Sequence, residues 1–257
     1  MKRFLLLIFM AICISAIIPQ KVHAFDLTAG LTTWYAWWDV DQGNKGSENM
    51  DPKFLIGPAL AFKINDEFNI TFVFLYGKYE HKGPQDSPSF SEKTKNKRSD
   101  SDLALNYKLH DYLKVFAGFK YMAYKKDKKG VVTSPLPPGM TTTPETEKND
   151  HSGFGPGIGV SATYPIYDNI FLLATLSGFY LWGSEEVDSS RAGSGKINYR
   201  EYGFNSTLAA AYYIAPASTV VSLGGRYQYF VAPYDDYVYP KHKFYGITLT
   251  ATYTFSI

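Results

Sequence analysis

Apolar and polar residues alternate along most of this chain, and the pattern is clearest at its C-terminal end. In residues 245–257 every odd position holds an apolar or aromatic side chain, and every even position holds Gly, Thr or Ser. Residues 27–37 follow nearly the same alternation. A repeat of two places one kind of side chain on each face of a strand, whereas a helix would require a repeat near 3.6. Both segments are therefore predicted to be β-strands.

Eight further segments with strand character lie between these two. Each has about the ten residues that a tilted strand needs to cross a bilayer, or more. The sequence therefore predicts about ten strands, with eight or twelve as the alternatives. The eight additional segments are residues 53–64, 68–81, 99–109, 112–125, 151–164, 169–182, 197–214 and 218–231.

The connections between the expected strands alternate between short and long. A soluble β-sandwich would also show alternating strands, but it would not need this rhythm. Short turns at one rim, long loops at the other and an even number of strands are typical of an all-β, transmembrane, antiparallel up-and-down β-barrel. Because a free strand edge cannot be satisfied by water inside lipid, the first strand should pair with the last. The short connections are 65–67, 110–111, 165–168 and 215–217, and the long ones are 41–52, 82–98, 126–150, 183–196 and 232–242.

With this pattern the chain resembles the Gram-negative outer-membrane β-barrel proteins, and small porin-like barrels among them, over its whole length after residue 24. The resemblance implies an outer-membrane location, contact with outer-membrane lipid and lipopolysaccharide, and insertion by the barrel-assembly machinery. In this class the last strand usually ends in an aromatic residue. Here Phe255 keeps the outward position, but the chain ends in Ile257.

Residues 1–24 have the order of a secretory signal peptide. Lys2 and Arg3 precede an apolar run over residues 4–18, and Ala24 provides a small residue before the expected cleavage point. The apolar run is shorter than the roughly 20 residues that a membrane anchor would need. The predicted organisation is therefore a removed signal peptide at 1–24 and one barrel at 25–257. Removal of this segment also removes Cys13, the only cysteine, and with it any disulfide or thiolate site.

Composition fits this interpretation. The 257 residues carry a formal net charge of only +2, which gives no indication of nucleic-acid binding. Aromatic residues make up 17% of the chain, and in a barrel they are expected in girdles at the two membrane interfaces. The candidates are Trp34, Tyr35, Trp37, Trp38, Tyr79, Tyr124, Trp182 and Tyr229 near the long loops, and Tyr112, Tyr164, Tyr212, Tyr213 and Phe255 near the short turns.

The residues that face the lumen should decide the function. Charged groups inside a barrel require either partners or water. Water around them would give a narrow porin-like channel for small hydrophilic solutes, which is the predicted function. Close pairing would instead give a non-conducting structural or adhesion barrel that acts through its extracellular loops, which is the alternative. Extending the alternation inward predicts six charged lumen residues: Asp102, Lys108, Lys114, Lys120, Glu201 and Arg226.

Four glycines alternate at 153, 155, 157 and 159, so one face of the expected strand has no side chains. This row either leaves space for a solute or a bulky neighbour, or it relieves strain where the sheet curves sharply.

An enzyme is not expected, although a hydrolase at the rim is a remote alternative. The chain resembles the ten-stranded omptin-type proteases in topology, and these carry an aspartate pair and an Asp-x-His pair at the extracellular rim. Asp100 and Asp102 open one strand here, but Asp150 and His151 are adjacent and should point to opposite faces. The histidines are scattered among different turns and loops, so neither a metal site nor a cofactor is predicted.

A lysine run near the fifth strand is the candidate for lipid contact. Lipopolysaccharide phosphates outside the barrel would attract basic side chains at the rim. The alternative is that these lysines are only solvated. The candidate residues are Lys125, Lys126, Lys128 and Lys129.

Overall fold

The structure is a computed structural model that describes residues 26–41, 47–82, 90–132, 145–190, 193–233 and 240–256. The predicted signal peptide lies outside these residues. Within them, no helix has the length and apolar character to span a membrane. The strands are β1 (Asp26–Asp41), β2 (Ser47–Lys63), β3 (Phe68–Lys82), β4 (Phe90–His110), β5 (Leu113–Val132), β6 (Glu145–Tyr167), β7 (Ile170–Ser189), β8 (Gly193–Ile214), β9 (Thr219–Val231) and β10 (Lys241–Ser256).

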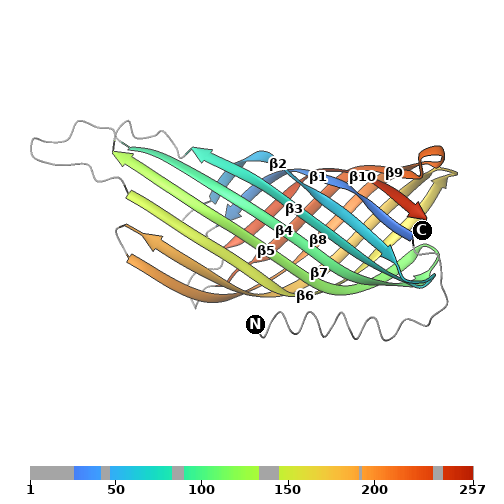
Figure 1. Cartoon of the computed structure of the whole chain (residues 1–257). Coiled ribbons are helices and arrows are strands. Elements are labelled where there is room, and N and C mark those ends of the chain that lie inside the picture. Colours follow the sequence, from blue (N-terminus) through green and yellow to red (C-terminus); the bar gives the residue numbers. More distant parts are fainter. Residues whose placement is uncertain are drawn as a thin grey trace, which may run out of the picture.

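The ten strands form one closed barrel in which each strand is antiparallel to the next (Figure 1). β1 pairs with β10 along its whole length, from Asp26 opposite Ser256 to Asp41 opposite Lys241. The prediction of a ten-stranded antiparallel up-and-down barrel is confirmed. Closure gives every strand two hydrogen-bonded neighbours, which is the condition for placing β-structure in lipid.

Tight turns join the strands at one end of the barrel. In the β2–β3 turn the side-chain oxygen Oδ1 of Asn65 accepts hydrogen bonds from the backbone N–H groups of Glu67 (2.9 Å) and Phe68 (2.7 Å). Between β8 and β9, a 3-10 turn over Ala215–Ala217 is followed by Ser218 in the left-handed conformation, with φ of 44°. These turns have the positions predicted from the sequence.

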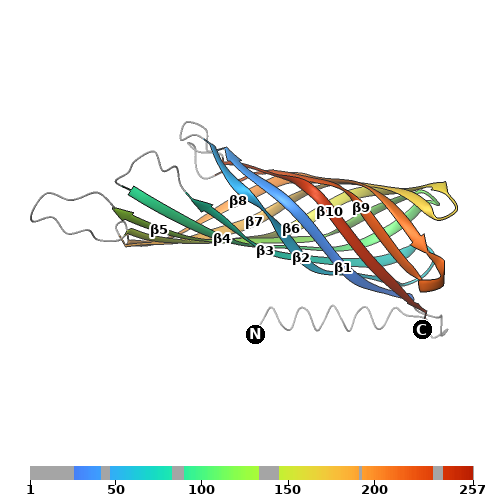
Figure 2. The same ribbon diagram turned by 90° about the horizontal axis from the view of Figure 1, so that it is seen from above.

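Most strands extend further toward the long-loop end than the alternation predicted. β4 begins at Phe90 and not at 99, β5 ends at Val132 and not at 125, and β6 begins at Glu145 and not at 151. β7 and β8 extend similarly, and Figures 1 and 2 show this side of the barrel projecting beyond the rest. Above the membrane a strand needs no apolar face. The Lys, Glu, Asn and Thr residues of these extensions therefore resemble loop residues in the sequence, although they pair across the sheet.

The aromatic girdle prediction is wrong for four of its residues. Trp34, Trp38, Tyr79 and Tyr124 are buried inside the barrel. The reason is the alternation itself: Trp37 and Trp38 are neighbours on one strand, so only one of them can face lipid. The outward wall is made instead by exposed side chains such as Phe54, Leu103, Phe119, Ile158, Trp182, Leu208 and Ile247.

Candidate functional site inside the barrel

Several side chains meet across the interior from strands that are not neighbours in the sheet. Arg98 Nη2 on β4 donates a 2.8 Å hydrogen bond to Gln228 Oε1 on β9. Tyr124 OH on β5 donates to Glu201 Oε1 on β8 over 2.9 Å. Since β4 and β9, like β5 and β8, are separated by other strands, these bonds cross the lumen. The barrel is therefore filled at this level.

Asp100 forms the centre of a charged cluster, which we define as Arg98, Asp100, Asp102, Lys120 and Arg226. Its carboxylate binds Lys120 Nζ at 2.6 Å and Arg98 Nη2 at 2.8 Å. Lys120 also reaches Asp102 at 2.9 Å, and Arg226 Nη2 lies 3.5 Å from Asp102 Oδ2. Arg98, Asp100 and the Lys120 ammonium are almost completely inaccessible to solvent. Isolated charges at these positions would be very costly, and the mutual pairing offsets that cost.

An aromatic group packs directly against the cluster. We define it as the inward-facing Trp34, Trp38, Tyr79, Phe179, Phe230 and Phe244, and call it, together with the charged cluster, the buried layer. The Arg98 guanidinium carbon lies 3.5 Å from the centre of the Phe244 ring, and that of Arg226 lies 4.6 Å from the Trp34 ring. Stacking over aromatic faces stabilises guanidinium groups that have left water. Leu55, Leu75, Met122 and Leu181 fill the remaining space around these rings.

A second polar group lies among Glu201, His151, Tyr199 and Tyr124. His151 Nε2 is 2.8 Å from Glu201 Oε1 and 2.5 Å from Tyr199 OH. The His151 ring is stacked between the rings of Tyr124 and Tyr199, with centroid distances of 3.7 and 4.4 Å. Asp150, one residue before His151, is on the outside and binds Lys125 Nζ at 2.5 Å. The two residues face opposite ways, as the sequence predicted.

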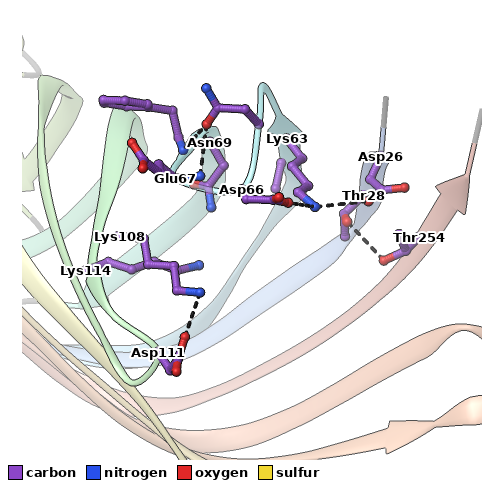
Figure 3. Close-up of a pocket in the computed structure, with 13 residues that line it drawn as sticks. Asp26, Thr28, Lys63, Asp66, Glu67, Asn69, Lys108, Asp111, Lys114 and Thr254 are labelled. Carbon is purple, nitrogen blue, oxygen red and sulfur yellow. Dashed lines mark hydrogen bonds and ion pairs between the residues drawn. The ribbon is translucent and has the colours of Figure 1, made fainter. Parts of the chain in front are cut away.

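The short-turn half of the lumen is hollow. A cavity of about 500 Å³ is bordered by Asn, Thr and Ser side chains and also by apolar ones such as Val73 and Phe116. Lys120, Asp102 and Arg226 of the charged cluster also line it. A second cavity, of about 400 Å³, lies at the short-turn mouth (Figure 3). There Lys108 Nζ binds Asp111 at 2.7 Å, and Lys114 lies nearby. The lumen is thus open and polar at one end and filled toward the other.

The six charged residues predicted for the lumen fall into separate places. Lys120, Asp102 and Arg226 belong to the charged cluster, and Glu201 belongs to the histidine group. Lys108 and Lys114 lie at the short-turn mouth and do not join them.

The sequence reasoning missed Arg98 as a lumen residue, because it was assigned to a loop. It also missed Asp100 and His242 as members of the filled interior, whereas Gln228, expected to face the lumen on the ninth strand, does so. The sequence did contain a signal for Arg98 and Asp100. Counting back from Asp102 in steps of two reaches Asp100 and Arg98 on the same face.

The lysines expected to contact lipopolysaccharide do not all lie on one face of the barrel wall. Lys125 is exposed on the outward face, whereas Lys126 is half-buried on the opposite face. The side chains of Lys128 and Lys129 lie outside the described part of the structure. In that part, no three potential ligands come together as a metal site.

Comparison with known proteins identifies a family for this sequence. The family profile described as Legionella pneumophila major outer membrane protein precursor matches residues 48–234, which is more than half of the chain. No curated protein matches the sequence.

Solved structures give the fold. The outer membrane protease OmpT from Escherichia coli is 12% identical, with a TM-score of 0.61, covering 92% of this chain and 100% of that one. The translocator domain of the autotransporter NalP from Neisseria meningitidis is 13% identical, with a TM-score of 0.41, covering 94% of this chain and 92% of that one. The likeness to OmpT shows a shared barrel fold, and the family match identifies an outer-membrane protein. The chain belongs to the family of the Legionella pneumophila major outer membrane protein.

Proposed function

We propose that this protein is a non-conducting barrel of the outer membrane, with a structural or surface-interaction role exercised at its long-loop end. The observation that carries the proposal is the buried layer. Trp34, Arg98 and Phe244 have no exposed surface, and Asp100 is only 1% exposed. A hydrated ion or small solute would need a continuous wet path, and these side chains occupy the place where it would run.

The carboxylates inside the barrel support a structural role over hydrolysis. A general base must be free to accept a proton from water. Asp100 and Asp102 are instead bound to Lys120 and to arginines, and one oxygen of Glu201, Oε1, is bound to His151 and Tyr124. These contacts favour ion pairs that hold opposite sides of the barrel together.

The predicted narrow channel is the second candidate, and one observation favours it. The polar cavity of about 500 Å³ reaches the charged cluster from the short-turn side. If the buried layer rearranged, this cavity would form half of a conduit for small hydrophilic solutes. The two candidates therefore differ in whether the layer opens.

Planar-bilayer conductance of the refolded full-length barrel tests the proposal. We expect no current above that of bare lipid from the wild-type protein. A variant with Trp34→Ala, Arg98→Ala and Phe244→Ala removes three fully buried side chains and should conduct. An open porin measured in the same bilayers is the positive control. Resistance of each barrel to unfolding in detergent without heating verifies that it is folded.

Steady wild-type current of a size that matches the porin control would refute the non-conducting barrel and support the channel. Current that appears only in the triple variant would identify the buried layer as the barrier.

A further inference from the structure

Three lysines lie opposite one another on the outer wall of the barrel. The strand register pairs Lys78 on β3 with Lys97 on β4, and Lys97 with Lys125 on β5. All three are exposed, and directly paired residues share one face with Cβ atoms about 5 Å apart. We call these residues the lysine row. Like charges placed directly opposite each other destabilise a sheet, so the row is unfavourable unless something else compensates it.

Compensation from the protein itself is small. Lys125 binds Asp150, whose side chain is about half exposed. Within the described residues, neither Lys78 nor Lys97 takes part in an ion pair. Among the described residues, the three cations are therefore matched by one ion-paired carboxylate, that of Asp150, and Asp127 adds a weaker attraction to Lys125.

The lysine row lies at the height where the membrane ends. Between it and the short turns, the same three strands present five outward rows that are mostly apolar. Each row advances about 5 Å along the barrel axis for strands tilted by roughly 40°. The row is thus roughly 25 Å from the lowest one, which is the height of the apolar band of such barrels. The five rows are Tyr76–Ser99–Ala123, Phe74–Ser101–Tyr121, Phe72–Leu103–Phe119, Ile70–Leu105–Ala117 and Phe68–Tyr107–Val115.

Three other outward lysines near this rim face carboxylates. Lys243 is opposite Asp39 and Lys241 is opposite Asp41 in the β1–β10 register. Lys196 Nζ lies 2.8 Å from Glu186 Oε1. The sector over β3, β4 and β5 thus differs in carrying a row of one sign at the membrane boundary.

We propose that Lys78, Lys97 and Lys125 bind the phosphate groups of lipopolysaccharide in the outer leaflet. Phosphate oxygens are strong acceptors for ammonium groups, and their negative charge would relieve the repulsion within the row. Acyl chains of the same lipid would cover the apolar rows beneath. Lys125 is shared with the set expected from the sequence, but Lys126 is not part of the site because it lies on the opposite face.

The experiment measures binding of purified diphosphorylated lipid A by the full-length refolded protein in detergent micelles. The test variant combines Lys78→Gln, Lys97→Gln and Lys125→Gln. The matched control combines Lys196→Gln, Lys241→Gln and Lys243→Gln, which removes the same charge from lysines that face carboxylates. We expect binding by the test variant to weaken roughly 100-fold, because each surface cation near anionic lipid contributes about fivefold. The control should bind as the wild type does.

Two further probes identify the recognised chemistry. Lipid A from which the phosphates have been removed should bind weakly to all three proteins, without a difference between them. Micelles containing phosphatidylglycerol at equal charge should distinguish the test variant from the wild type much less. Equal loss in the test variant and the control, unchanged binding by the test variant, or an equal effect with phosphatidylglycerol would each overturn the proposal. None of these results depends on whether the barrel conducts.

Discussion

At the scale of single residues, His242 shows how burial sets a side chain's charge. It lies beyond the apolar part of β10, on the inward face, where its ring stacks on Phe230 at 4.7 Å. Trp38 Nε1 donates a 3.3 Å hydrogen bond to His242 Nδ1. Burial lowers the pKa of His242 well below its ordinary value, and the neighbouring His151 and Arg98 lower it further. The folded protein therefore holds this imidazole neutral.

This neutral imidazole predicts acid sensitivity. Below pH of about 6.5 an unfolded chain protonates His242 while the folded chain does not, so stability falls as pH falls. The expected contribution is about 1.4 kcal/mol per pH unit between about pH 6 and the lower folded-state pKa. Urea unfolding midpoints at pH 7.5, 6 and 5 measure it. His242→Phe should flatten the dependence, although loss of the Trp38 bond lowers its stability at every pH.

A control residue separates this effect from general titration. His110 is exposed at a short turn, so His110→Asn should leave the pH dependence as steep as in the wild type. If His242→Phe is just as steep, the imidazole is not the group responsible.

The sequence could predict the face of a residue but not its partner across the lumen. Alternation along β4 places Asp102 inward without any structure. That Arg98 would meet Gln228, 130 positions away, depends on the diameter of the barrel and the stagger of its strands. Neither quantity can be read from local periodicity, since both arise only when the sheet closes.

At the scale of strands, the glycine row of β6 combines the two interpretations considered for it. A Cβ atom at Gly159 would lie 2.4 Å from the Phe116 ring, and one at Gly153 would lie 2.8 Å from the Glu201 carboxylate. Gly153 makes room for a large neighbour, and so does Gly159, although a Cβ there would also lie 2.5 Å from the Leu176 carbonyl oxygen. At Gly155 the obstacle is backbone, because a Cβ there would lie 2.0 Å from the Tyr180 carbonyl oxygen. Here the backbone of the neighbouring strand occupies the place of a side chain.

The difference between backbone and side-chain neighbours predicts different effects of alanine along β6. Gly155→Ala should destabilise the barrel by about 1–3 kcal/mol, because a strand cannot move aside as a flexible side chain can. Gly157→Ala is the matched substitution two residues away on the same face, where the nearest atom would be 3.3 Å distant. Its effect should stay below about 1 kcal/mol. Urea unfolding of the two refolded variants measures both values, and equal losses would contradict the assignment.

Strand number and turn positions were predictable because the membrane imposes alternation on the segments that cross it, and turn residues mark where those segments end. The strand extensions were not, since outside lipid the outward face of β5 carries Lys125 and Asp127 in place of apolar residues. Their strand structure depends on cross-strand neighbours such as Asp150 opposite Lys125. Pairing of this kind links residues of two strands, and a single run of sequence does not contain it.

At the scale of the whole molecule, the barrel is polar and hollow toward the short turns and densely filled toward the long loops. The filled half brings tryptophan inside an outer-membrane barrel, where the girdle rule would place it outside. Among the four tryptophans of the chain, Trp34 and Trp38 are buried in the lumen, whereas Trp182 is 58% exposed on the outer wall. Trp37 faces outward and stacks on Tyr245. The position of each tryptophan, inside the barrel or on its outer wall, can therefore be measured by fluorescence.

Quenching by lipids with brominated acyl chains should separate the tryptophans into two pairs. Four variants that each keep one tryptophan, with the others replaced by Phe, are refolded into such vesicles and compared with vesicles of the unbrominated lipid. Fluorescence of Trp37 and Trp182 should be strongly quenched, because bromine atoms can approach them from the bilayer. Fluorescence of Trp34 and Trp38 should change little, because the barrel wall separates them from lipid. Strong quenching of Trp34 would mean that β1 presents its other face to the membrane, and with that face reversed Arg226 would lose the Trp34 ring against which it stacks.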